Sequence, residues 1–315
     1  MNELRIIGSK VETSVQEASF QFANVEASLM TRTPYYEMIR HHLKKGAYWS
    51  LVPSSKQGMA ESCTVETGEV EVHVQGDTYR LYETDVLSLI DLAEFVVFHA
   101  VRDTTLIYLS SQPVYDPYFE LVGKIQKLAV EIELKDGYTS RHCSRIMEWS
   151  LAVGRELGLS PERLYHLQHG AFFHDVGKVA IPNEILGKPG RLTAEEWEIM
   201  KTHPLRGSEL LREIYSDQLS EPSVIVEQHH ERYDGSGYPF GLRGDEIHIG
   251  AAIVAVVDSY DAMTTNRIYQ RAKPPQQALQ EIKQLSGQLY DPRVVDAFCK
   301  VIERDAEIVR LAADR

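Results

Sequence analysis

The sequence predicts a multidomain protein with a mainly β N-terminal domain, of the small-barrel or jelly-roll type, and an all-α C-terminal bundle. Apolar and polar residues alternate with a period of two between Thr64 and Leu109, which is typical of half-buried strands. After residue 136 the apolar residues recur every three or four positions, which is typical of helices. A chain of 315 residues also suits two domains better than one. We therefore expect domains over residues 1–112 and 137–315, joined by a connecting helix over 113–136.

The N-terminal domain is expected to be a sensor or regulatory domain whose ligand the sequence does not identify. Several short strands at close spacing predict an antiparallel barrel or sandwich. They are expected near Val70–Val74, Tyr79–Leu81, Val86–Ile90, Glu94–Ala100 and Thr104–Leu109. By pattern alone, the domain faintly resembles cupin or cyclic-nucleotide-binding jelly rolls. Upstream, residues 34–45 look more helical, and His41 and His42 are expected to be solvated.

The connecting helix is predicted because its apolar residues step by four and three. These residues are Tyr118, Val122, Ile125, Ala129 and Ile132. Such a helix can transmit a signal, form a homodimer seam over residues 115–135, or simply pack on its own domain, and so few heptads do not establish a coiled coil.

The C-terminal domain is expected to contain seven helices, several with proline, a capping residue or an acid in the first turn. They are predicted at Thr139–Leu157, Pro161–His174, Thr193–Ile214, Pro222–His230, Ile249–Thr265, Pro274–Leu285 and Pro292–Val309.

Composition excludes several classes of function. The formal net charge of −13 argues against binding a nucleic-acid polymer or an anionic membrane, both of which need a basic face. The longest apolar stretches are too short or too interrupted by acids to cross a bilayer. Only three cysteines occur, far apart, which predicts a reducing cytoplasm without a disulfide framework.

The chemistry is expected in the region rich in histidine. His174-Asp175-Val176-Gly177-Lys178 combines an imidazole, a carboxylate that can bridge two cations and a lysine that can contact a phosphate. Taken alone, this string also fits a helix C-terminus with a buried histidine. Further candidate donors follow or precede this string, and together they indicate a metal site more strongly than any lone histidine does. They are His142, His203, His229, His230 and Asp258. Because the set offers nitrogen and oxygen but no thiolate, it favours iron, manganese, zinc or a similar first-row ion over structural zinc.

These strings resemble the HD-GYP subgroup of the HD-domain phosphohydrolases over residues 115–310. The match consists of the His174–Lys178 string, His229-His230-Glu231, Asp234–Pro239 and Asp258–Thr264. The resemblance implies an HD-type helical bundle that hydrolyses cyclic di-GMP to the linear dinucleotide, and in some members on to GMP. It implies that the metal ligands are His142, His174, Asp175, His203, His229, His230 and Asp258.

The resemblance further predicts a site with two divalent ions, iron or manganese, bridged by Asp175. Members that hold a third metal use a glutamate where this chain has Tyr138. A pair of cations acidifies a water and orients the phosphodiester for in-line attack. Asp175 and Lys178 are then the catalytic residues, and Lys178 also binds substrate. The other substrate contacts expected from the family positions are Tyr238, Arg267, Tyr269 and Arg271.

Some features leave alternatives open. The loop around Tyr238 can be a plain surface turn or a wall of the cleft. Gln270 stands where the family often has an arginine, for which Arg271 can substitute, and Ala251 and Ala252 stand where an arginine commonly precedes the apolar run. These departures leave base selectivity open. Hydrolysis of another phosphate ester such as cyclic GMP-AMP, or a non-catalytic cyclic-dinucleotide receptor, remain the alternatives.

Overall fold

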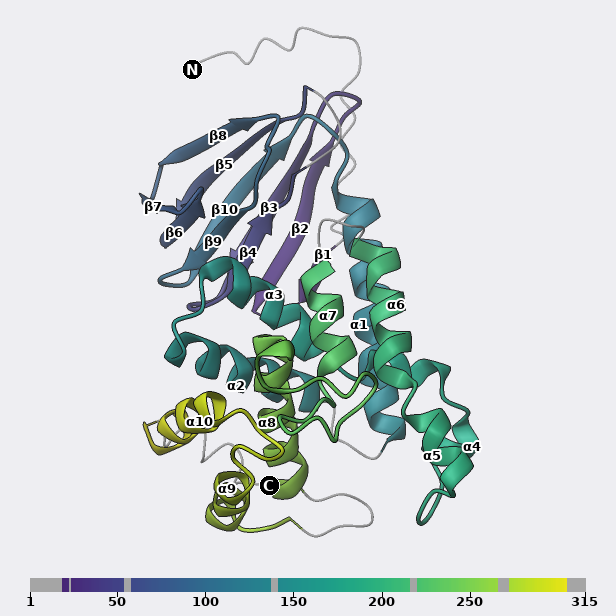
Figure 1. Ribbon diagram of the computed structural model, residues 1–315. Helices are drawn as coiled ribbons and strands as arrows, with labels where there is room; N and C mark the ends of the chain where they lie inside the picture. The colour runs from purple at the N-terminus through teal and green to yellow at the C-terminus, as the bar shows by residue number, and fades with distance from the viewer. Residues whose placement is uncertain are drawn as a thin grey trace, which may run out of the picture.

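The computed structural model describes residues 19–22, 24–53, 58–136, 141–215, 220–265 and 272–304. A β domain sits on one end of a helical domain, and a long helix runs down the side of both (Figure 1). The predicted fold class, a jelly-roll-like β domain followed by a helical domain, is therefore confirmed.

The β domain is a sandwich of two antiparallel sheets. The first sheet has six strands in the order β1-β2-β3-β10-β5-β8, and the second has four in the order β4-β9-β6-β7. The strands are β1 Ser19–Phe22, β2 Val25–Arg32, β3 Glu37–Leu43, β4 Tyr48–Leu51, β5 Ala60–Thr67, β6 Glu69–Val74, β7 Asp77–Tyr82, β8 Val86–Ile90, β9 Val96–Ala100 and β10 Thr104–Ser110.

The alternation seen in the sequence defines the interior of this sandwich. Val70 and Val72 of β6 are fully buried in a core shared with Phe98 of β9. The intervening Glu71 and His73 point to the opposite face of the sheet, because successive side chains of a strand alternate.

The prediction of a helix over residues 34–45 is wrong. Residues Glu37–Leu43 form β3, in which Ile39, His41 and Leu43 are all buried. The expectation that His41 is solvated is therefore also wrong: its ring lies against Trp49, with centroids 4.3 Å apart. A polar residue at an inward position concealed the period of two.

Helix α1, Tyr115–Lys135, connects the two domains. Its predicted apolar face is buried at Val122, Ile125, Ala129 and Ile132. The N-terminal end is fixed to the β domain, because Glu37 accepts hydrogen bonds from the backbone N–H groups of Val114 and Tyr115.

The remaining elements form the helical domain, in which α2, α3, α7 and α8 pack together. They are α2 His142–Glu156, α3 Pro161–Phe172, the 3₁₀ helix η1 Val176–Ala180, α4 Asn183–Leu186, α5 Ala194–Met200, α6 His203–Tyr215, α7 Ser220–Gln228, the 3₁₀ helix η3 Gly244–Glu246, α8 Ile249–Thr264, α9 Pro275–Gln284 and α10 Pro292–Arg304. Within the described part of the chain, none of the helices is long and apolar enough to span a membrane.

The single helix predicted over Thr193–Ile214 is two helices. Helix α5 ends at Met200, and α6 begins at His203. Pro204 has no N–H to continue the earlier helix and is well tolerated in a first turn. The break turns the His203 ring toward the centre of the domain.

The β domain meets the helical domain through apolar packing, because Phe22, Tyr48 and Val97 belong to the core of the helical domain. Phe22 of β1 stacks on Phe173, with ring centroids 5.6 Å apart, and lies 5.1 Å from Phe172. Tyr48 of β4 is buried in the same core. Strand β1 thus contacts the residue that immediately precedes His174.

Candidate metal centre

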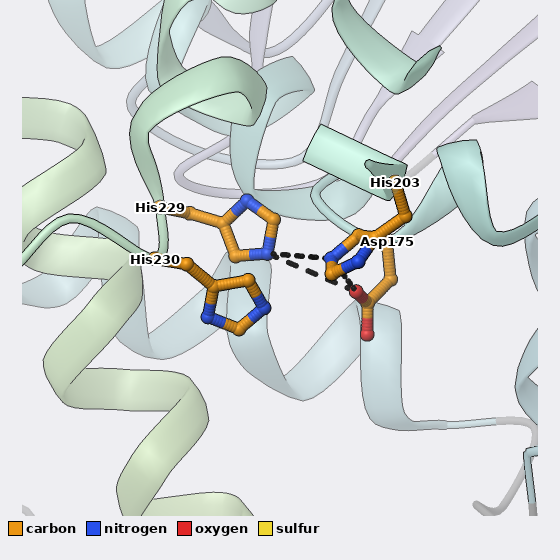
Figure 2. Close-up of side chains that lie close together, drawn as sticks. All are labelled: Asp175, His203, His229 and His230. Carbon is orange, nitrogen blue, oxygen red and sulfur yellow. Dashed lines mark hydrogen bonds and ion pairs between the residues drawn. The ribbon is translucent and has the colours of Figure 1, made fainter. Parts of the chain in front are cut away.

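The histidines and aspartates predicted as ligands converge at one place in the helical domain, although they are spread over more than a hundred residues. Most of them lie where a helix begins or ends: His142 starts α2, His174 and Asp175 follow α3, His203 starts α6, and His229 and His230 follow α7. Asp258 projects from within α8. Figure 2 shows three of the imidazoles directed toward Asp175.

The imidazoles are oriented by hydrogen bonds on the far side of each ring. The Nδ1 atom lies close to a backbone carbonyl three residues earlier in three cases: His174 to Ala171 (2.9 Å), His203 to Met200 (2.8 Å) and His229 to Val226 (2.6 Å). A carbonyl only accepts, so Nδ1 carries a proton and Nε2 faces the centre, where its lone pair can bind a metal once the ring is neutral.

The donor atoms form two groups that can each hold a cation. The first is Asp175, His203, His229 and His230, and the second is His142, His174 and Asp258. One carboxylate faces both groups. Asp175 Oδ1 lies 3.2 Å from His203 Nε2 and 3.8 Å from His229 Nε2, whereas Oδ2 lies 3.4 Å from His174 Nε2.

The separations within the groups fit ligands that share an ion. Donors about 2.1 Å from one cation at tetrahedral angles are about 3.4 Å apart, longer than a good hydrogen bond. The Nε2 atoms of His203 and His229 are 3.4 Å apart, and His142 Nε2 lies 3.6 Å from Asp258 Oδ1. The residues present therefore fit divalent metal ions.

Several of these atoms are buried without a hydrogen bond to any of the described residues. They are His174 Nε2, Asp175 Oδ1 and Asp258 Oδ1. Buried polar atoms that lack partners are costly, and an ion bound in each group would satisfy all three. The Asp175 and Asp258 side chains are 10% and 18% exposed, so the centre opens to solvent at its carboxylates, while the rings of His142 and His174 are fully buried.

The pKa shifts of the candidate ligands indicate a site that favours bound cations. Burial alone would raise the pKa of Asp175, but the Lys178 ammonium and the His174 ring outweigh burial and hold the pKa well below its usual range. Burial alone would lower the pKa of His174, but Asp175 and Asp258 outweigh it and raise the pKa to about 9. For His230, burial and the neighbouring His229 both lower the pKa.

His142 is held differently from the other imidazoles. Its Nδ1 donates to Asp261 Oδ2 at 2.7 Å, and Arg145 donates to both oxygens of Asp261 at 2.6 and 2.8 Å. Asp261 therefore orients a candidate ligand histidine through the ring nitrogen that faces away from the centre. Sequence reasoning missed Arg145, which lies on α2 one turn after His142, because its partner Asp261 lies on a different helix, α8.

Lys178 lies between two carboxylates. Its Nζ is 2.8 Å from Asp175 Oδ2 and 2.5 Å from Asp136 Oδ2 at the C-terminal end of α1. Sequence reasoning missed Asp136, for which no local signal exists because the contact spans 42 residues. Close backbone packing fixes the turn that carries Lys178: a Cβ on Gly177 would lie 2.0 Å from the carbonyl oxygen of His203.

Tyr238 borders the first ligand group. Its ring centroid is 4.8 Å from that of His230, and its backbone N–H donates to the His230 carbonyl. Glu231 fixes the loop beyond it by accepting backbone N–H groups of residues 240–242 at 2.6, 3.2 and 3.1 Å. The other predicted contacts, Arg267, Tyr269 and Arg271, and also Tyr138, lie outside the described residues.

Comparison with known proteins gives the class. The HD domain family matches residues 126–294, more than half of the chain, and the chain belongs to this family. The match begins inside α1 and covers every residue of both ligand groups.

The individual relatives are named as phosphodiesterases of cyclic dinucleotides. A protein named cyclic di-GMP phosphodiesterase from Thermotoga maritima is 43% identical over 63% of this chain and 53% of its own length. A 3'3'-cGAMP-specific phosphodiesterase 2 from Vibrio cholerae is 34% identical over 55% of this chain and 33% of its own. The chain thus spans about half or less of these curated relatives. An RmlC-like cupin from Shewanella frigidimarina aligns at 14% identity and a TM-score of 0.29, covering 35% of this chain and 96% of the cupin.

Proposed function

We propose that the protein is a metal-dependent phosphodiesterase that hydrolyses cyclic di-GMP to the linear dinucleotide, at a centre with two divalent ions, iron or manganese. The observation that carries the proposal is Asp175, whose two oxygens face two separate groups of buried nitrogen and oxygen donors. A carboxylate so placed is suited to bridge a pair of ions. The similarity to a relative named cyclic di-GMP phosphodiesterase supports the substrate class.

The proposed ligands divide between the two ions. His142, His174 and Asp258 would hold one ion, and His203, His229 and His230 the other, with Asp175 common to both. When bound, two such ions supply an acidified water and positive charge for a phosphodiester. Iron and manganese suit this set because imidazole and carboxylate donors are present and thiolates are not.

The chain itself contributes positioning and charge. Lys178 presents an ammonium beside Asp175, where it would contact a phosphoryl oxygen of the substrate. Tyr238 lies beside His230, on a loop fixed by Glu231, where its ring can border a guanine base or the sugar-phosphate. Arg267, Tyr269 and Arg271 remain proposed substrate contacts.

Regulation by the β domain is part of the proposal. The domain touches the helical domain at Phe173, next to His174, and is joined by α1 to Lys178. A ligand that displaced β1 or α1 would therefore move groups adjacent to the centre.

The test pairs metal analysis with turnover. Protein purified without oxygen should carry two iron or manganese ions per chain and cleave cyclic di-GMP. Asp175→Ala should lose both metal and turnover, whereas Asp245→Ala, at a residue 84% exposed, should retain them. Two bound metals without cleavage of any cyclic dinucleotide would refute the proposal and favour a non-catalytic cyclic-dinucleotide receptor.

Cyclic GMP-AMP is the alternative substrate, favoured by the similarity to the relative specific for 3'3'-cGAMP. Competition between the two dinucleotides for one enzyme preparation separates them. Preferential cleavage of the hybrid would transfer the proposal to that substrate with the same metal centre.

A further inference from the structure

A second cluster of metal-binding side chains lies in the β domain, far along the chain from the helical centre. Glu71 and His73 are two positions apart on β6, so they point to the same face of the sheet. His99 stands directly opposite Glu71 on the neighbouring β9. Strand geometry alone therefore brings one carboxylate and two imidazoles together on the outer face of the four-stranded sheet.

The distances in this cluster resemble those of the helical centre. Glu71, His73 and His99 each offer a ligand atom within 4.8 Å of the other two. Glu71 Oε2 and His99 Nδ1 are 3.4 Å apart. This separation is long for a hydrogen bond but equals that of two ligands about 2.1 Å from one tetrahedral ion.

One ring nitrogen of the cluster is buried without a partner. His73 Nδ1 is 2.9 Å from the hydroxyl of Thr78, which fixes the ring. His73 Nε2 is buried and makes no hydrogen bond with any residue that the structure describes. A bound cation would satisfy it.

The surrounding charges leave room for a cation. Arg80 contacts Oε1 of Glu71 and also Glu69, at 3.1 Å, so one oxygen of Glu71 still faces His99. Glu71 and His99 are 23% and 25% exposed, so an ion can enter.

We propose that Glu71, His73 and His99 form a separate binding site for a divalent transition metal such as zinc, with a fourth position open to water or a small ligand. Three nitrogen and oxygen ligands with one open position are a common arrangement for zinc in proteins.

The site adjoins the contact between the domains. The His99 ring stacks on Tyr48, with centroids 4.6 Å apart. Arg155 of α2 lies over the same tyrosine ring and donates to the carbonyl of Gly46 at 2.9 Å. A metal that fixes His99 therefore stabilises the packing of β4 against the helical domain.

The experiment counts zinc in the full-length chain. Metal-stripped protein is dialysed against buffered zinc chloride, and bound zinc is measured by mass spectrometry. His73→Gln and Glu71→Gln should each bind one zinc fewer than the parent. His42→Gln is the matched control, because His42 Nδ1 also contacts a threonine hydroxyl, at 3.2 Å, and lies outside the cluster; it should bind as the parent does.

A background variant separates this site from the helical centre. Asp175→Ala should still bind zinc in the β domain, and adding His73→Gln to this background should remove one further zinc. Circular dichroism checks that each variant is folded. If His73→Gln does not fold, the zinc content of Glu71→Gln decides the test. Zinc content unchanged by the cluster substitutions, an equal loss in His42→Gln, or no zinc in Asp175→Ala would each overturn the proposal.

Discussion

Replacement of Asp261 by asparagine should weaken metal binding without touching a proposed ligand. Asp261 accepts the Nδ1–H of His142, and a partner of this kind orients a ligating imidazole and raises its basicity. Loss of such a partner typically costs 10–100-fold in metal affinity, about 1.4–2.7 kcal/mol. We expect Asp261→Asn to fall in this range.

The same substitution should destabilise the fold. The pKa of Asp261 is about 2: burial would raise it from 3.8, but His142 and Arg145 outweigh burial. The shift corresponds to roughly 2 kcal/mol, present above pH 3.8 and lost as the pH falls through 2. Because Asp261→Asn also leaves the Arg145 charge buried beside a neutral amide, we expect the larger cost of roughly 3–5 kcal/mol.

The assay is metal retention against a graded chelator, with urea unfolding of the metal-free protein alongside. Asp245→Asn is the matched control: its bond to Arg293 is 2.7 Å long, but Asp245 is 84% exposed, so the cost should stay within about 1 kcal/mol. Unchanged metal affinity in folded Asp261→Asn would show that the orientation of His142 does not depend on this carboxylate.

Two further predictions concern the groups around Asp175. Because the pKa of His174 is about 9 in the metal-free protein, a metal ion must displace a proton from this ring. The apparent affinity for the metal should therefore rise about tenfold per pH unit between pH 7 and 9. Titration calorimetry with proton release measures this dependence, and an affinity that does not change with pH contradicts the prediction. Asp136→Asn should misplace Lys178 and lower kcat for cyclic di-GMP about 10–100-fold, which corresponds to the loss of one charged hydrogen bond. Asp136→Glu should restore part of the lost kcat. Equal kcat values in the parent and both variants would refute the positioning role of Asp136.

Much of the helical domain could be predicted because its signals are local. Ser160 accepts the backbone N–H of Arg163, and Thr193 and Glu196 form a capping box, both where the sequence indicated helix starts. The break at His203 was missed because the apolar spacing continues across it, although Pro204 marks it. In the β domain, β3 was missed because a polar residue, His41, occupies a core position and interrupts the apolar pattern.

The partners of the ligands could not be predicted in the same way. The turn geometry that aims His174, His203 and His229 is local, since each ring bonds a carbonyl three residues earlier. The contacts Arg145–Asp261 and Lys178–Asp136 join residues 116 and 42 positions apart. Only the packing of the helices determines which carboxylate meets which cation.

The β domain and the C-terminal end of α1 both contact residues that flank His174 and Asp175. Phe22 packs on Phe173, one residue before His174, and Asp136 holds Lys178, one turn after it. Both contacts therefore act on the short segment that contains Asp175. His229 and His230 follow α7, which packs on α6 and α3, and α3 itself contacts β4 and β9 of the β domain. A movement of the β domain would therefore reach both the turn that carries Asp175 and, through α3, the helix that precedes these imidazoles.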